Sequence, residues 1–488
     1  MGKASDKPSN LGSVAVRGAS WTYIAFYSGK ITVFLSTIIL ARLLTKGDFG
    51  VVGYAITVIG FLDVIKDLGI GLAVIYHDDE EVADTAFWLN LIIGLLLFLL
   101  VWITAPYVGV FFEDQRAVSI TRILALNFPL SSIGSTHDAL LVKRLAFNRK
   151  FIPDFSRAIT KGLLSIILAY LNFGPWSLIY GQLSGTIVSV FILWRLVDWR
   201  PSFAFTNSIA QSLLKFGLPI VGVNIVSVLA QNMDYLVIGR YLDAEALGVY
   251  TLAFRIPELT LLQFCVIIAQ VVFPVFTKIR DDVGALQNGF LETTRYVTLF
   301  TVPVGVGMAL LSTPFVLTFF GEKWVDAAPI MSAISLYGLF ISFGYNAGDV
   351  YKAQGRPGML TVISFVHILI LTPLLIWAVR DKADIVLVGW VQAFVALIIS
   401  IIYLAIALRM LNLPLSRLLN AFKTSFIPAL SLIGFVSVVK ILVINSASYI
   451  QLILGVIVGA VSYTGFLYLF ERKIVEDALT LIQKVAKR

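Results

Sequence analysis

The sequence has little charge, little histidine and almost no cysteine. Of its 488 residues, 14% are charged, three are histidine and one is cysteine. Soluble domains carry about 25% charged residues, so a soluble globular protein is excluded. The single Cys265 rules out an internal disulfide and a thiolate metal cluster.

Motifs of common catalytic sites are also missing. The sequence contains no Walker A loop and no HExxH pattern, which excludes direct use of ATP by this chain and zincin-type hydrolysis. A membrane polymerase or ligase would place catalytic residues on a large outer loop, and no connection is long enough for one. We therefore expect neither an enzyme nor a bound metal or cofactor.

Long apolar runs dominate what is present. Hydrophobic residues make up 58% of the chain, and the mean hydropathy is +0.90. Runs of about 20 apolar residues, the length that crosses a hydrocarbon core, recur from end to end. Barrel strands would show weaker alternating segments. We predict an all-α polytopic membrane protein with about 14 transmembrane helices. They are expected near 16–44, 48–76, 84–112, 117–143, 151–172, 175–198, 210–240, 245–275, 288–312, 326–351, 358–379, 384–409, 423–444 and 448–470.

Basic residues indicate the orientation of these helices. With the N-terminus in the cytoplasm, about three times as many Lys and Arg residues fall on inner as on outer connections. The positive-inside rule therefore predicts that both termini are cytoplasmic. The net charge of +8 then reflects topology, not nucleic-acid binding.

The chain contains an internal repeat. "ARLLTKGDFGVVGYA" (41–55) aligns without a gap on "GRYLDAEALGVYTLA" (239–253). We predict two pseudo-symmetric six-helix lobes around a central cavity, residues 1–200 and 201–412. Two additional helices follow in 413–472, with a cytoplasmic tail in 473–488. Parallel repeats of this kind occur in transporters whose substrate site lies between the halves.

Ionisable residues at membrane depth are the functional candidates, because an unpaired charge there is costly. Arg255 and Glu258 flank Pro257 in one apolar stretch and, three residues apart, share a helix face. Lys30 and Asp63 also lie near the midplane. We expect Lys30 and Arg255 to contact an anionic head group and Glu258 and Asp63 to bind a coupling proton or cation. Structural salt bridges are the alternative.

Three further candidates lie closer to the outer side. Arg42 and Arg240, matched by the repeat, are added as substrate-binding residues, and Asp234 as a coupling carboxylate. A bridge between Asp234 and Arg240 at the outer rim is the alternative. On the inner side, Arg157 and Lys161 are candidates for a vestibule.

Several segments resemble a known family. They are "ILARLLTKGDFGVVGYA", "DLGIGLAVI", "FPVFTKIRDD" and, most specifically, "FFGEKWVDAAPIM" (319–331). The chain resembles the polysaccharide exporters of the MOP superfamily, in particular Wzx-type lipid-linked oligosaccharide flippases of the WzxC/TuaB-like branch. The resemblance covers nearly the whole chain.

The resemblance implies a multi-pass protein of the bacterial cytoplasmic membrane that works by alternating access. Its substrate would be an undecaprenyl-diphosphate-linked oligosaccharide, flipped from the inner to the outer leaflet for export of a surface polysaccharide. Coupling to H⁺ or Na⁺ is expected, with membrane lipids and polysaccharide polymerase or export machinery as partners. The alternative is a MATE-like cation-coupled drug or metabolite antiporter. Such antiporters typically have twelve helices, so the additional pair in 413–472 argues against that alternative.

Overall fold

The computed structural model describes residues 28–66, 68–76 and 80–472, and within these ranges all regular structure is helical. In this described part of the chain, ten helices are long and apolar enough to cross a membrane. An eleventh span arises if α12 (Val283–Leu310) and α13 (Ser312–Phe319), bent by 71°, count as one. The prediction of an all-α polytopic protein is confirmed. The number 14 stays a prediction, and the first half of the helix near 16–44 and the tail 473–488 lie outside the described residues.

The chain forms two compact units, which divide between Gly248 and Val249. The sequence repeat places its boundary near residue 200 instead, so the lobe assignment from the repeat stays a prediction. Each unit has its own packed helices, described separately below.

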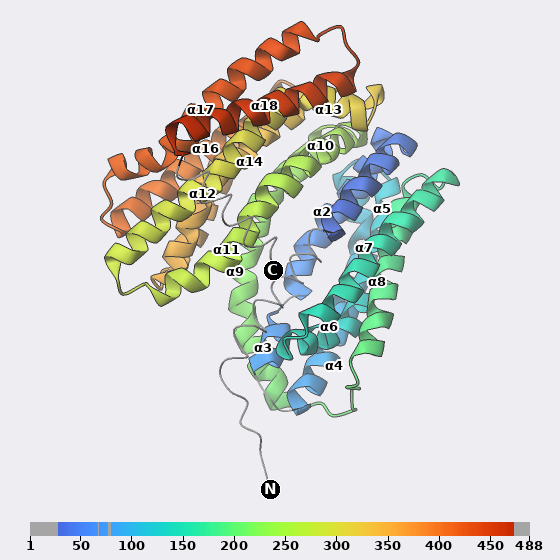
Figure 1. Cartoon of the computed structure of the whole chain (residues 1–488). Helices are drawn as coiled ribbons and strands as arrows, with labels where there is room; N and C mark the ends of the chain where they lie inside the picture. The colour runs from blue at the N-terminus through green and yellow to red at the C-terminus, as the bar shows by residue number, and fades with distance from the viewer. Residues whose placement is uncertain (1–27, 67, 77–79, 473–488) are drawn as a thin grey trace. The chain divides into compact units, whose positions relative to one another are not determined.

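The first unit contains a helix over 28–43 and eight labelled helices. These are α2 (Lys46–Lys66), α3 (Ile70–Tyr76), α4 (Glu80–Phe111), α5 (Arg116–Leu124), α6 (Asn127–Lys143), α7 (Phe147–Tyr170), α8 (Trp176–Leu196) and α9 (Asn207–Tyr241). Helix α7 packs along α8, α4 along α6, and α2 along α9. Figure 1 shows α7 and α8 side by side.

Two of the predicted helices contain irregular backbone in this unit. The helix predicted over 48–76 is divided into α2 and α3, and Gly69 between them has φ +67°, a left-handed conformation that glycine adopts readily. The helix predicted over 117–143 has a turn at Ala125 and Leu126, between α5 and α6, but Arg116–Lys143 still forms one membrane-length span, as predicted. Apolar character persists across both positions, which is why hydropathy alone did not detect them.

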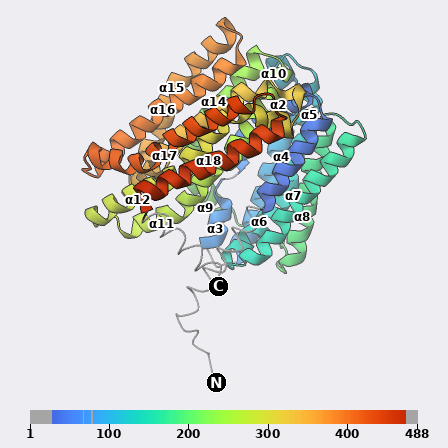
Figure 2. The same ribbon diagram turned by 45° about the horizontal axis from the view of Figure 1, so that its top comes forward.

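The second unit begins within α10 (Ala244–Pro257). The elements that follow are η1 (Glu258–Leu262), α11 (Gln263–Lys278), α12, α13, η2 (Glu322–Trp324), α14 (Ala327–Ala353), α15 (Gly358–Ile376), η3 (Trp377–Asp381), α16 (Ile385–Met410), α17 (Leu415–Leu442) and α18 (Ser448–Phe470). Helix α14 lies at the centre of this unit. Of the residues in its apolar 18-residue segment, 72% are buried, and the helix packs against α11, α12 and α16. Helices α17 and α18 lie side by side (Figure 2) and both contact α12.

Prolines inside helices leave carbonyl groups without their usual partner, because proline has no N–H to donate. Two of these carbonyls accept hydrogen bonds from neighbouring helices. The carbonyl of Trp102, four residues before Pro106, accepts from Arg122 Nε at 3.2 Å. The carbonyl of Leu299, four residues before Pro303, accepts from the Tyr463 hydroxyl at 3.2 Å. Such contacts give the carbonyl groups freed by proline a hydrogen-bond partner where no water is available.

Candidate functional site

The stretch that carries Arg255, Pro257 and Glu258 is a continuous helical span with an irregular segment inside it. Helix α10 ends at Pro257, and a π-helical segment, η1, connects it to α11 within one apolar span from Ala244 to Lys278. Pro257 cannot donate to the carbonyl four residues earlier, so the regular hydrogen-bond ladder is disturbed there. Single π turns inside α-helices occur frequently at functional sites. The irregular backbone thus lies at the predicted site residues.

Arg255 and Glu258 form an ion pair. Arg255 Nη1 donates to Glu258 Oε2 at 3.1 Å, and the side chains are 36% and 30% exposed. The sequence spacing allowed this pairing, and a salt bridge was the alternative to a binding role; the structure contains the salt bridge. Each charge therefore neutralises the other, so Arg255 can accept an anion fully only when Glu258 is released or neutralised.

The two candidates of the first unit lie on separate helices. Lys30 is half-buried on the helix over 28–43. Asp63, on α2, lies 3.9 Å from Lys66 Nζ, and Lys66 also donates to Ser131 Oγ of α6 at 2.6 Å. Asp63 therefore has a local cation beside it. Lys30 and Asp63 belong to the first unit and Arg255 and Glu258 to the second, and a cavity shared by all four stays a prediction.

The outer candidates take part in different contacts. Arg240, at the end of α9, forms an ion pair with Glu113, and its guanidinium lies 5.9 Å from the ring centroid of Phe111. Asp234 is fully buried on α9, and its Oδ1 accepts from the backbone N–H of Tyr235 at 2.9 Å. Arg42 is exposed near the end of the first described helix. The carboxylate beside Arg240 is thus Glu113, which is 127 residues away in the chain.

Helix α14 carries buried polar groups that were not among the predicted site residues. Asp349 is only 2% exposed, and its Oδ1 accepts from Lys352 Nζ at 3.1 Å. Asn346, one turn earlier, is 1% exposed. Further along the helix, Ser342 shares a hydrogen bond of 2.8 Å with Thr301 of α12. The regular recurrence of small polar residues on α14 was the available signal.

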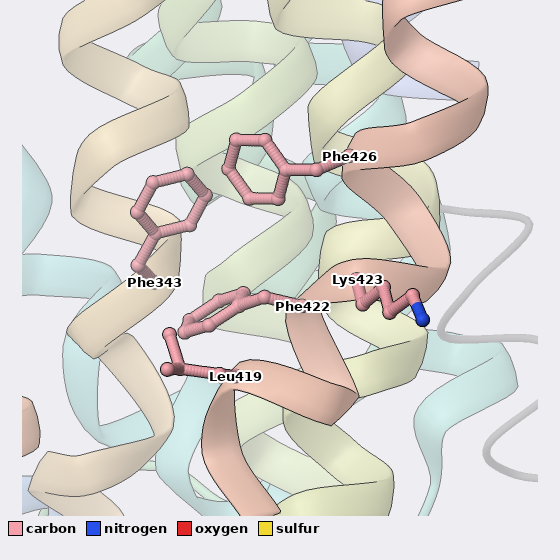
Figure 3. A pocket seen from close by; sticks show the side chains of 5 residues that line it. All are labelled: Phe343, Leu419, Phe422, Lys423 and Phe426. Carbon is pink, nitrogen blue, oxygen red and sulfur yellow. The ribbon is translucent and has the colours of Figure 1, made fainter. Parts of the chain in front are cut away.

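A shallow, open apolar pocket of about 350 Å³ lies between α14 and α17 in the second unit. It is lined by Phe343, Leu419, Phe422, Lys423 and Phe426. Figure 3 shows the three phenyl rings turned toward one another, while the amino group of Lys423 points away from them. Phe343 makes an edge-on contact with Phe422 at a centroid distance of 5.3 Å. These walls suit hydrocarbon and offer nothing that would orient a sugar.

Among the described residues, no group of three or more His, Cys, Asp or Glu side chains is placed to hold a metal ion. The candidates that can interact with charged species are therefore the basic residues and isolated carboxylates described above. Their chemistry is electrostatic: the binding of anions by guanidinium and ammonium groups, and of protons or cations by carboxylates.

Comparison with known sequences identifies a family and a similar protein. The sequence model of a family described as "Polysaccharide biosynthesis protein" matches residues 39–329, more than half of the chain. The teichuronic acid biosynthesis protein TuaB of Bacillus subtilis (strain 168) is 28% identical over 453 residues, 91% of this chain and 93% of that protein.

Solved structures show a similar fold. The lipid II flippase MurJ, in an inward closed conformation, is 17% identical with a TM-score of 0.76, and the match covers 94% of this chain and 100% of that one. An inward-facing multidrug resistance MATE family transporter of the MOP superfamily is also 17% identical, with a TM-score of 0.65. That match covers 78% of this chain and 94% of the other. At such identities the likeness shows the fold alone.

Proposed function

The chain belongs to the polysaccharide biosynthesis protein family of the MOP superfamily, and from this membership we propose that it flips lipid-linked oligosaccharides across a membrane. The observation that carries the proposal is the family match over residues 39–329. Two further similarities support the proposal. The teichuronic acid biosynthesis protein TuaB aligns over nearly its whole length, and the lipid II flippase MurJ has a similar fold.

The substrate we propose is an undecaprenyl-diphosphate-linked repeat unit. Its polar head cannot enter hydrocarbon unaided, because buried charges and unpaired polar groups are costly there. A protein that carries it must supply cations for the diphosphate and leave the lipid chain in the bilayer. We propose Lys30, Arg255, Arg42 and Arg240 as cations that contact the head group.

The Arg255–Glu258 pair suggests how the head group and a coupling ion exchange. When a diphosphate approaches Arg255, it competes with the Glu258 carboxylate 3.1 Å away. The released carboxylate is then free to take up H⁺ or Na⁺, which removes the charge repulsion between the two anions. Asp63 and Asp234 are proposed as further coupling carboxylates, and alternating access of the two predicted lobes as the transport cycle.

We place the protein in the bacterial cytoplasmic membrane with both termini in the cytoplasm, on the basis of the distribution of Lys and Arg. The exported product would be a surface polysaccharide, handed on to polymerase or export machinery. A MATE-like antiporter of drugs or metabolites is the second candidate, because a MATE transporter shares the fold over 78% of this chain.

Deletion of the gene tests the proposal. A flippase predicts accumulation of a complete oligosaccharide repeat on undecaprenyl diphosphate, which extraction and mass spectrometry would detect. Normal lipid-linked pools together with increased sensitivity to cationic drugs would instead support the antiporter.

A further inference from the structure

Arg157 lies deep in a helix of the first unit. It is ten residues into α7, about 15 Å from the start of that helix at 1.5 Å per residue. Lys161 lies one turn further on. Helix α7 has 24 residues, enough to cross a membrane, yet it is too polar to be among the candidate spans. A half-buried cation at this depth needs a counter-charge or a polar surrounding.

Some other basic residues of the first unit have carboxylate partners. Lys150 pairs with Asp138 and, at 3.7 Å, with Asp154. Arg240 pairs with Glu113. In these pairs the carboxylate neutralises the basic side chain, so neither Lys150 nor Arg240 needs a bound anion as counter-charge.

Arg157 differs from these residues. Among the described part of the chain, no carboxylate oxygen lies within 4.0 Å of its guanidinium; Asp154, three residues earlier, interacts with it electrostatically but forms its salt bridge with Lys150. The buried Nε of Arg157 has no hydrogen-bond partner. An arginine always carries its charge and offers five N–H donors. Leaving such a donor buried without an acceptor is unfavourable, which a bound anion would correct.

The backbone of α7 is held in place beside α8. A Cβ atom added at Gly185 of α8 would lie 2.7 Å from the carbonyl oxygen of Arg157 and 3.4 Å from its Cγ. One added at Gly181 would lie 2.8 Å from the carbonyl oxygen of Lys161. The two helices therefore approach each other closely at both levels. Arg157 and Lys161, four residues apart, present two cations from one face of a fixed helix.

We propose that Arg157, assisted by Lys161, is an anion-binding site of the first unit that holds the diphosphate of the lipid-linked substrate. This inference rests on the proposed flippase function and assigns a new residue to it. Arg157 suits the role better than Arg255, because Arg255 must first give up its bond to Glu258. A guanidinium also binds phosphate oxygens in a bidentate manner that an ammonium cannot reproduce.

Binding of inorganic pyrophosphate to the purified full-length protein in detergent tests the site by calorimetry. The variants are Arg157→Gln, Arg157→Lys and the control Arg195→Gln, whose guanidinium lies 5.0 Å from the exposed ring of Phe191 on α8. We expect Arg157→Gln to weaken binding at least about tenfold, Arg157→Lys to retain part of it, and Arg195→Gln to bind as wild type. Size-exclusion profiles and helical circular dichroism establish that each variant is folded.

Three results would overturn the assignment: no pyrophosphate binding by the wild type, unchanged binding by a folded Arg157→Gln, or equal losses in Arg157→Gln and Arg195→Gln. None of these depends on flipping. If the binding test fails but gene deletion causes lipid-linked repeat units to accumulate, the proposed function is supported and the Arg157 site is rejected. If deletion leaves the pools normal but Arg157 binds pyrophosphate, the anion site stands without that function.

Discussion

Gly50 and Gly248 each lie against the backbone of the other's helix. A Cβ atom at Gly50 would be 1.6 Å from the carbonyl oxygen of Ala244, and one at Gly248 would be 1.9 Å from that of Lys46. The register of the sequence repeat aligns Gly50 with Gly248 and Lys46 with Ala244. The contact is therefore reciprocal between two segments that the sequence repeat aligns. It joins the starts of α2 and α10 within the first unit.

This contact predicts that Gly50→Ala is severely destabilising. A methyl group at 1.6 Å from a backbone oxygen forces α2 and α10 apart, at a cost of at least about 3 kcal/mol, the upper range of overpacking. Folded yield and the melting temperature in detergent measure the effect. Gly47→Ala is the matched control, because its Cβ would meet Glu245 Cγ at an ordinary 3.8 Å. Equal stability of the two variants would contradict the close packing.

The Tyr463 hydrogen bond predicts a smaller effect. Tyr463→Phe removes the donor to the Leu299 carbonyl that Pro303 leaves unpartnered, at a cost of about 1 kcal/mol. Thermal unfolding in detergent should show a lower melting temperature for Tyr463→Phe. The exposed Tyr449 on the same helix provides a control, since Tyr449→Phe should leave the melting temperature unchanged. A shift of the same size in both variants would show that the hydrogen bond contributes nothing measurable.

The Arg255–Glu258 pair predicts that function and stability respond differently to substitution. Arg255→Gln and Glu258→Gln should each abolish export, and each should lower stability because the remaining half-buried charge has lost its partner. The double variant removes both charges, so it should recover stability but not export. Complementation of a deletion strain and thermal unfolding measure the two properties. If the double variant exports as wild type does, the pair has only a structural role.

Asp114 predicts a pH dependence of stability at the connection between α4 and α5. Hydrogen bonds from the Arg116 side chain, one of 2.7 Å from Nη2, hold the pKa of Asp114 below its ordinary value. Because the folded-state pKa is depressed, the pair stabilises the protein above the ordinary aspartate pKa of about 3.9. That stability is lost as the pH falls through the lowered pKa. Unfolding of wild type and Asp114→Asn should differ at neutral pH and converge in acid. A difference that persists in acid would rule out this origin.

Much of the architecture followed from local sequence. The apolar runs predicted α8, α14, α16 and α18 to within a few residues, because a helix that must satisfy its own backbone in hydrocarbon is specified by its length and composition. The spacing of Arg255 and Glu258 was compatible with the ion pair that the structure contains. Helix breaks such as that at Gly69 did not, because the apolar pattern continues through them.

Contacts between distant segments were out of reach of such reasoning. Glu113, in the connection after α4, pairs with Arg240 at the end of α9, and no local pattern relates residues so far apart in the chain. The burial of Asp349 depends in the same way on helices that are distant in the sequence, because Asp349 is only 2% exposed in the folded unit. Arg157 was one of several inner basic residues, and only the geometry separated it from those that have carboxylate partners.

Reconstitution tests the central claim most directly. Purified protein is placed in liposomes that contain an undecaprenyl-diphosphate-linked oligosaccharide, and the glycan accessible to an impermeant glycosidase is measured over time. With wild-type protein, the account predicts that glycan digestion continues beyond the portion in the outer leaflet toward completion. With Arg255→Gln, digestion should end at the outer-leaflet portion, as it does in protein-free vesicles. Digestion by wild-type vesicles that also stops at the outer leaflet would contradict the assignment as a flippase of this substrate.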